Sequence, residues 1–203
     1  VEIKGNQVDG RLCIKFPWPS IARTIWGDHQ RYKDTYFSAF KGMYFTGDGA
    51  LRDEVGYYRI TGRVDDVIIV SGHNLGTAPI EDSINEHPAV AESAIVGFPH
   101  DVKGNALYGY VTLKDSGEDR NHDNLRKEIN QLITDRIGPI AKLDKIQFTN
   151  GLPKTRSGKI MRRILRKIAC NETDNLGDIS TLLNPEVVQE IIDDSNNLKS
   201  TNW

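Results

Sequence analysis

The chain of 203 residues has few cysteines and no long apolar run. Its two cysteines, Cys13 and Cys170, have neither the density of a disulfide-stapled secreted domain nor the spacing of a zinc site, which favours a reducing, cytoplasmic location. The longest clean apolar run, at residues 67–70, is the length of a strand and falls far short of the roughly 20 residues that span a bilayer. These shortages exclude a disulfide scaffold and an integral membrane protein.

The chain also has little net charge, with 26 Lys and Arg against 28 Asp and Glu and a formal charge of -2 at pH 7. Such a balance creates no general basic field, so neither nucleic acid nor a membrane surface is expected as a partner. Any anion must therefore be bound locally. The most basic stretch is PKTRSGKIMRRILRK, residues 153–167, which contains no acidic residue.

The sequence pattern changes at residues 64–66, where we place a domain boundary. Before it, runs such as RLCIKF and YYRIT predict β-hairpins, with no long helical period. After it, strands and amphipathic helices alternate. We expect strands at 67–70, 92–98, 107–113 and 145–149, and helices at 78–87, 124–137, 159–168 and 185–193, followed by polar residues to Trp203. The predicted fold class is α+β, a small mixed β-sheet covered by helices and preceded by a short β-rich segment.

Two polar residues of the first part are candidates for binding a nucleotide. YFTGDGA, residues 44–50, places Asp48 in a predicted glycine turn, where its two carboxylate oxygens could accept hydrogen bonds from a ribose diol. Arg63, at the end of a predicted strand, could fork onto a hydroxyl or a phosphate. Taken alone, Gly-Asp-Gly is more often an ordinary hairpin turn.

The junction that follows offers weaker signals. Asp65 and Asp66 are neighbours on a predicted extended chain, so their side chains point to opposite faces and a shared metal ion is not expected. They indicate a hinge or a strand start. Ser71, Gly72 and His73 predict a glycine turn, which either exposes its backbone to a ligand or is an ordinary connection.

The basic stretch predicts a phosphate-directed lysine. Pro153 fixes the chain direction, Ser157 and Gly158 predict a flexible loop, and Lys159 stands at the start of the next predicted helix. When a carboxylate attacks a phosphate, an ammonium between the two anions offsets their repulsion and stabilises the charge that develops. A solvated basic helix face, a nucleic-acid patch and an anionic-membrane contact are the alternatives.

Taken in order, YFTGDGA, GYYRITGRVDDVIIVSGHNLG and PKTRSGK resemble the C-terminal part of the acetyl-CoA synthetase family, within the acyl-adenylate-forming superfamily. The resemblance runs from PWPSIARTIWGDH to NLGDISTL. It implies a ligase that makes acetyl-AMP and pyrophosphate from acetate and ATP, with Mg²⁺ as cofactor, and then transfers the acetyl group to CoA. It also implies three regions: residues 1–64 closing the large N-terminal domain, residues 65–175 forming the C-terminal lid, and a tail at 176–203.

The resemblance assigns roles to four residues. The lid of this family rotates about a hinge that matches Asp65, while Asp48 and Arg63 would hold the ribose and the nucleotide. Lys159 matches the lysine that serves adenylation and leaves the active site for the second step. In this family that lysine is also modified by an acetyltransferase and a deacetylase, and acetylation removes its charge.

The CoA site implied by the resemblance departs from the family pattern in two places. Ser71 and Gly72 match the turn that lines the CoA channel. Asn74 replaces a usual arginine and is included among the nucleotide-binding candidates. Near Thr134 the family commonly has a basic residue for the ribose phosphate of CoA, and the nearest one here is Arg136.

A cation site is also implied, at positions that match Asn85, His87 and Val90. Unpaired carbonyls at a helix end are good ligands for a hard cation. The alternative is that His87, which precedes Pro88, simply ends the helix.

The resemblance covers little of a complete active site, because the phosphate loop and the adenine and carboxylate pockets belong to the family's N-terminal domain. With no initiator methionine, Val1 is expected to be a cut end, and the chain alone should not make acetyl-CoA. An apolar surface is expected around Trp18, Trp26, Tyr36 and Phe37. The alternatives are a propionyl- or other short-chain acyl-CoA ligase, a stand-alone regulatory module that displays the Lys159 loop, and a nucleic-acid binder.

Overall fold

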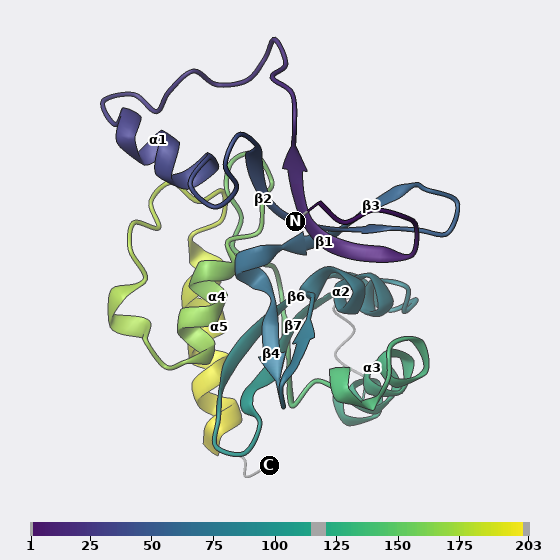
Figure 1. Cartoon of the computed structure of the whole chain (residues 1–203). Coiled ribbons are helices and arrows are strands. Elements are labelled where there is room, and N and C mark those ends of the chain that lie inside the picture. Colours follow the sequence, from purple (N-terminus) through teal and green to yellow (C-terminus); the bar gives the residue numbers. More distant parts are fainter. Residues whose placement is uncertain (1, 115–120, 201–203) are drawn as a thin grey trace. The chain divides into compact units, whose positions relative to one another are not determined.

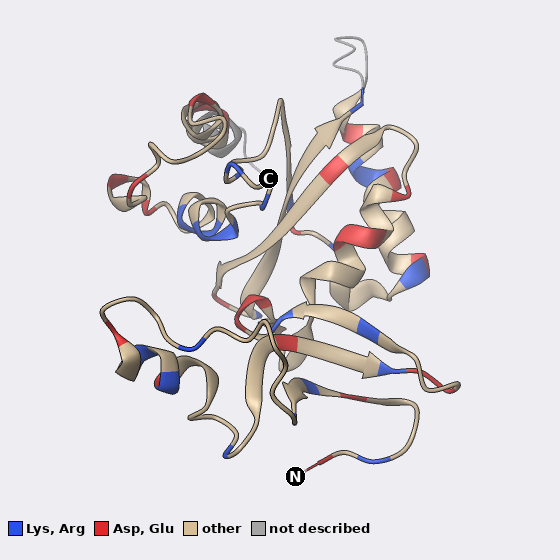
Figure 2. Cartoon of the chain, turned by 90° about the horizontal axis from the view of Figure 1, so that it is seen from above, with Lys and Arg blue, Asp and Glu red and all other residues tan. Residues whose placement is uncertain are grey.

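The computed structural model describes residues 2–114 and 121–200 and divides the chain into two compact units, Val1–Val67 and Ile68–Trp203 (Figure 1). The predicted boundary at 64–66 forms a short 3₁₀-helix, η1 (Val64–Asp66), within the first unit. Trp203 lies outside the described residues. Acidic and basic residues are spread over helices, strands and loops of each unit (Figure 2).

The first unit contains an antiparallel sheet in the strand order β1-β2-β3. Its elements are β1 (Val8–Ile14), α1 (His29–Tyr36), β2 (Tyr44–Arg52) and β3 (Tyr58–Arg63). The predicted strands are present, but the sequence analysis did not predict α1. This helix has no apolar stripe along one face, and Tyr32 is its buried residue. The Asp28 carboxylate caps its N-terminus by accepting a hydrogen bond from the Arg31 amide at 2.9 Å.

The first unit buries little apolar surface. Tyr32 and Ala50 are the buried hydrophobic residues among those described in this unit, whereas Trp26 is 98% exposed. Of the expected apolar surface, Trp18, Tyr36 and Phe37 are half-buried, because their rings pack against Tyr44. Trp26 is thus fully exposed, and the other three aromatic side chains are partly exposed.

The second unit is built on a mixed five-stranded sheet, which confirms the predicted fold class. Four strands lie in the antiparallel order β5-β4-β7-β6, and β8 pairs with β7 in parallel. The strands are β4 (Ile68–Val70), β5 (His73–Leu75), β6 (Val90–His100), β7 (Gly104–Leu113) and β8 (Lys145–Thr149).

Helices cover both faces of this sheet, with α2 and α3 on one side and α4 and α5 on the other (Figure 1). The helices are α2 (Thr77–Asn85), α3 (His122–Arg136), α4 (Arg162–Ala169) and α5 (Glu186–Ser200), with 3₁₀ turns η2 (Pro139–Ala141) and η3 (Thr173–Asn175). None of the helices in the described ranges is long and apolar enough to cross a membrane.

The alternation of side chains along β7 divides the interior into two cores. Leu107 and Val111 pack with α2 and α3, while Tyr108 and Tyr110 pack with α4 and α5, as expected for successive residues of a strand. The two tyrosine rings are stacked with centroids 4.5 Å apart. The Tyr110 hydroxyl donates to the carbonyl of Leu165 at 3.1 Å, so this buried polar group is satisfied.

Two helix boundaries differ from the sequence-based prediction. Helix α4 begins at Arg162, so Lys159 precedes it by three residues instead of starting it. Helix α5 continues to Ser200, well beyond the predicted end at residue 193. Its buried residues Val187, Val188 and Ile191 hold its N-terminal half against the sheet.

Candidate functional site

Asp48 and Arg63 face each other across two paired strands of the first unit. They are register partners in β2 and β3, and the Arg63 Nη1 lies 3.6 Å from Asp48 Oδ1. Asp48 therefore lies inside a strand and not in the predicted glycine turn. The same guanidinium donates to the carbonyl of Thr46 at 3.2 Å and, through Nε, to Asp65 at 3.1 Å. Arg63 thus contacts both Asp48, its predicted partner in nucleotide binding, and Asp65, the predicted hinge.

Gly47 explains why the guanidinium can lie so close to β2. Its φ of +81° is a conformation that L-residues rarely adopt. A Cβ built at Gly47 would lie 2.7 to 2.8 Å from the guanidinium atoms of Arg63. Any larger residue here would displace Arg63 from Asp48.

A surface hollow of about 440 Å³ opens beside this arginine. Tyr36 and Tyr44 form part of its wall, stacked at 4.8 Å, and Thr46 and Asp65 also line it. Burial, followed by the neighbouring Tyr36, raises the pKa of Tyr44, so its hydroxyl stays neutral at physiological pH. Neutral aromatic rings beside a guanidinium and a carboxylate offer stacking, anion binding and diol binding in one place.

Asp65 lies in η1 and its side chain is 72% exposed. The predicted extended conformation of Asp65 and Asp66 is wrong, because both belong to this 3₁₀ turn.

Ser71 and Gly72 form the two-residue turn between β4 and β5, whose flanking residues Val70 and His73 are paired. Both turn residues have positive φ, 48° and 82°, which is typical of a type I′ hairpin. The Ser71 amide donates to the carbonyl of Lys103 at 2.9 Å, and this bond holds the turn against the start of β7. Asn74 follows on β5 with an exposed side chain.

Thr134 and Arg136 lie in the last turn of α3, and both already have partners. The Thr134 hydroxyl donates to the carbonyl of Asn130 at 2.7 Å. Arg136 pairs with Glu86, and both side chains are about half exposed. An exposed pair of this kind is weak, so Arg136 could exchange Glu86 for a phosphate at little cost.

The residues of the candidate cation site lie at the end of α2. The Asn85 side-chain oxygen accepts from Ser93 at 2.9 Å, and the His87 ring lies 3.3 Å from Glu128 and accepts from the Ala89 amide. These contacts occupy both side chains, which leaves main-chain carbonyls as the donors for a cation. The described residues contain no group of three or more His, Cys, Asp or Glu that could hold a metal ion.

Lys159 lies in a tight, hydrogen-bonded hairpin, where the sequence predicted a flexible loop. Lys154 and Ile160 pair across its base. The Thr155 amide donates to the Lys159 carbonyl at 2.9 Å, and the Lys159 amide donates to the Thr155 hydroxyl at 3.1 Å. The Lys159 side chain is exposed, so its ammonium is presented to solvent from a fixed backbone.

The basic residues of α4 make contacts within the fold, although Arg163 stays exposed, so the alternative of a solvated basic face remains open. Arg162 makes two hydrogen bonds to Glu81, at 2.6 and 3.2 Å, and Glu81 is only 7% exposed. Arg163 donates to the carbonyl of Leu176 at 3.0 Å, and Lys167 to that of Asn175. Glu81 thus neutralises the Arg162 charge, whereas Arg163 and Lys167 donate to neutral carbonyls and keep their positive charge, as Lys159 does in the hairpin.

Comparison with known proteins identifies the second unit. Residues 79–159 match the family described as "AMP-binding enzyme C-terminal domain". The second unit is therefore similar to this domain over those residues. The whole chain is also 60% identical, over 196 residues and 95% of its length, to an acetyl-coenzyme A synthetase of Syntrophobacter fumaroxidans (strain DSM 10017 / MPOB). It is 59% identical over 201 residues to the same enzyme of Alkalilimnicola ehrlichii (strain ATCC BAA-1101 / DSM 17681 / MLHE-1).

These matches confirm the resemblance of the sequence to acetyl-CoA synthetases. The chain spans about 30% of the length of the curated relatives it matches, and corresponds to their C-terminal part. The AMP-binding enzyme C-terminal domain and the segment before it are thus similar to those enzymes at most positions.

Solved structures support the same fold. Acetoacetyl-CoA synthetase from Streptomyces lividans has a TM-score of 0.78 at 22% identity, covering 95% of this chain and 29% of that one. The anthranilate CoA ligase AuaEII, in complex with anthranoyl-AMP, has a TM-score of 0.72 at 26% identity, covering 84% and 32%. The AMP-binding enzyme C-terminal domain of this chain therefore has the fold of adenylate-forming ligases.

Sequence reasoning missed several residues that shape these sites. The stacking of Tyr36 on Tyr44 could not be inferred, because Tyr36 belongs to α1, a helix that the sequence did not predict, and Tyr44 belongs to β2. The contact of Thr155 with Lys159 had a signal, since PKTRSGK separates the two by four residues, as a tight hairpin requires.

Proposed function

We propose that this chain is the C-terminal part of an AMP-forming acetate–CoA ligase, in which residues 65–175 act as the lid and residues 176–203 form the tail. The observation that carries this proposal is the hairpin that presents Lys159 from a rigid backbone, in a chain 60% identical to acetyl-coenzyme A synthetases. The parent enzyme would join acetate to the α-phosphate of ATP with release of pyrophosphate, and CoA would then displace AMP.

Lys159 would serve the first of these steps. Its ammonium bridges the acetate carboxylate and the phosphate, because two anions must approach each other before the bond forms. Positive charge held at that point stabilises the pentavalent transition state, an effect commonly worth about 10²- to 10³-fold in rate.

Asp48 and Arg63 would bind the nucleotide. The Asp48 carboxylate accepts hydrogen bonds from the ribose hydroxyls, and the Arg63 guanidinium, fixed at 3.2 Å from the Thr46 carbonyl, contacts a hydroxyl or a phosphate. Mg²⁺ would enter with ATP as part of the substrate, which suits a chain whose described residues hold no cluster of metal-binding side chains.

The second step would use other residues of the lid. We assign the CoA channel to the Ser71 and Gly72 turn, with Asn74 directed at the nucleotide and Thr134 and Arg136 at the ribose phosphate of CoA. Asp65 would be the hinge that exchanges the two lid positions.

Other partners follow from the same proposal. A hard cation would bind the main-chain carbonyls of Asn85, His87 and Val90. The large N-terminal domain of the enzyme would supply the remaining substrate pockets. We place the enzyme in the cytoplasm, where an acetyltransferase and a deacetylase would control the charge of Lys159.

The test uses the full-length ligase and its two half-reactions. In Lys159→Ala we expect ATP–pyrophosphate exchange with acetate to fall by roughly 10²- to 10³-fold, while acetyl-CoA formation from supplied acetyl-AMP survives. Arg156→Ala, which removes a charge from the same hairpin, is the control and should retain both activities. Full adenylation by Lys159→Ala would refute the proposal, as would pyrophosphate release from ATP and acetate by the purified 203-residue chain.

A further inference from the structure

The base of the Lys159 hairpin is bound by a segment that follows it by more than twenty residues. The Asn184 side chain accepts a hydrogen bond from the Lys154 amide at 3.1 Å and donates one to the Leu152 carbonyl at 2.9 Å. Beside it, the Leu183 amide donates to the Lys154 carbonyl at 2.8 Å, and Leu182 pairs with Thr155. Residues 182–184, which we call the strap, therefore extend the hairpin by one more strand.

The opposite side of the hairpin base is held by β6. The Lys154 ammonium contacts both carboxylate oxygens of Glu92, at 2.8 and 2.7 Å, with both side chains mostly shielded from solvent. The Met161 amide donates to the Pro153 carbonyl at 2.8 Å and fixes the exit toward α4. Contacts on both sides thus restrict the base, while the tip bears Lys159.

We propose that Asn184 is a positioning residue for the adenylation lysine, acting through the strap; this inference rests on the proposed role of Lys159. Within the strap, the side-chain amide of Asn184 bonds the backbone on both sides of Pro153, at Leu152 and at Lys154. A small rotation of the hairpin at this base is amplified at Lys159. Misplacement of a catalytic group by about 1 Å can cost roughly 10²-fold in rate.

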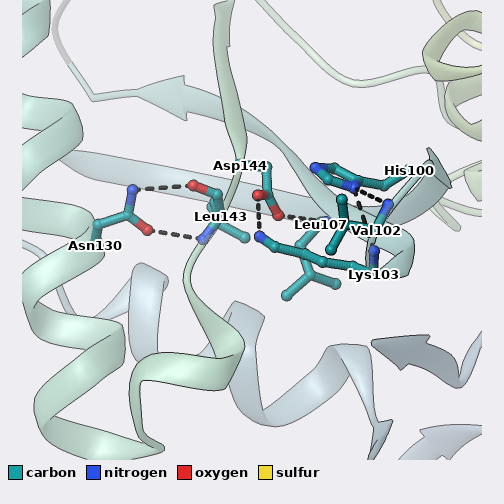
Figure 3. Close-up of polar contacts among 7 residues, drawn as sticks. All are labelled: His100, Val102, Lys103, Leu107, Asn130, Leu143 and Asp144. Atoms are coloured by element: carbon teal, nitrogen blue, oxygen red, sulfur yellow. Dashed lines mark hydrogen bonds and ion pairs between the residues drawn. The ribbon is translucent and has the colours of Figure 1, made fainter. Parts of the chain in front are cut away.

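The chain contains a second asparagine clasp that provides a matched control. Figure 3 shows Asn130 reaching from α3 to the segment before β8, where it accepts from the Leu143 amide at 2.8 Å and donates to the Leu143 carbonyl at 3.1 Å. Next to it, Asp144 accepts from the Leu107 amide and pairs with Lys103. Asn130 and Asn184 are both half-buried and make the same two kinds of bond, but the side-chain hydrogen bonds of Asn130 go to Leu143 and not to the hairpin.

The experiment compares the two clasps in the full-length ligase. We expect Asn184→Ala to lower the kcat of ATP–pyrophosphate exchange by roughly 10-fold or more, with acetyl-CoA formation from acetyl-AMP retained. Asn130→Ala should lose similar stability and keep full adenylation. In the Lys159→Ala background, Asn184→Ala should cause no further loss, because a positioning residue acts only through the lysine it positions.

A second readout does not depend on activity. Trypsin cleavage after Arg156 and Lys159, followed by mass spectrometry of the native enzyme, reports opening of the hairpin. We expect faster cleavage at both bonds in Asn184→Ala and wild-type cleavage in Asn130→Ala. If Asn184→Ala does not fold, Asn184→Asp takes its place, since it keeps the acceptor for Lys154 and loses the donor to Leu152; an intermediate loss of adenylation is then expected.

The outcomes separate the two proposals. Full adenylation by Lys159→Ala overturns the proposed function. If Lys159→Ala is inactive in adenylation but Asn184→Ala is fully active, only the role of the strap is wrong. An equal fall in both half-reactions, an equal effect of Asn130→Ala on adenylation, or an added loss in the Lys159→Ala background would also overturn the positioning role.

Discussion

The two units of the chain differ in how far they bury the apolar side chains of their small sheets. In the second unit helices cover both faces, and Ile129 and Ile164 are completely buried on opposite sides. In the first unit, strand residues Tyr58 and Ile60 remain 65% and 50% exposed. Paired strands alone therefore do not make a core. The second unit has its own helices to bury the apolar faces of its sheet, whereas the first unit leaves apolar strand residues exposed.

The sharpest way to break this comparison is to separate the units. We expect residues 68–203 alone to unfold in one cooperative urea transition, and residues 1–67 alone to show none, because few of their apolar groups are removed from water. Circular dichroism and near-UV signals measure both transitions. A cooperative transition in the isolated first unit would show that its sheet is self-sufficient.

A smaller effect is expected from the ion pairs of the two units. Glu81→Gln should lower the free energy of unfolding of the second unit by about 3 kcal/mol, because it leaves the Arg162 charge without its carboxylate. Asp65→Asn, which breaks the exposed pair with Arg63 in the first unit, should cost less than about 1 kcal/mol.

Urea denaturation of the 203-residue chain measures both changes, and a high-salt series separates them further. Salt screens exposed pairs strongly and buried pairs much less. Equal costs for the two variants would show that the Glu81 pair is as weak as a surface pair.

The smallest expected effect is that of Tyr110 on the stability of the second unit, and it should be visible only at alkaline pH. Burial raises the pKa of Tyr110 well above its usual value of 10, so the folded second unit keeps the phenol neutral while the unfolded chain ionises it. The resulting stability is fully present below pH 10 and is lost as the pH rises above it. Tyr110→Phe should weaken this alkaline loss, whereas Tyr58→Phe, at an exposed position of the first unit, should leave it unchanged; thermal melts from pH 7 to 11 provide the measurement.

The sequence predicted best those elements whose packing is local. The stripe Leu125, Ile129 and Ile133 defined α3, and KIQFT defined β8, since periodicity and turn residues are enough there. It failed for α1, whose sequence HQRYKDTY has no stripe, and for Asp48, because a Gly-Asp-Gly turn and a strand that needs a positive φ at Gly47 look alike. Local residues do not reveal such tertiary context.

The candidate site divides in the same way. Lys159 stood out because basic residues cluster around it, but Glu92 and Asn184, which contact the base of its hairpin, lie far from it in the chain. On α4 the fold likewise adds a partner that the sequence did not indicate, since Glu81, which holds Arg162, lies 81 residues earlier. Sequence composition indicates which charges are present, and only the fold shows which of them are already paired.

The strap also orders events during synthesis. Strands β6 and β7 and helices α2 and α3 leave the ribosome before Lys159 does, and domains fold as they emerge, from the N-terminus onward. Asn184 emerges later still, followed by the α5 carbonyl of Ile191 that accepts from Gln147. A nascent chain can therefore complete most of its sheet while the lysine hairpin is still unfinished, and the geometry on which adenylation is proposed to depend is among the last to form.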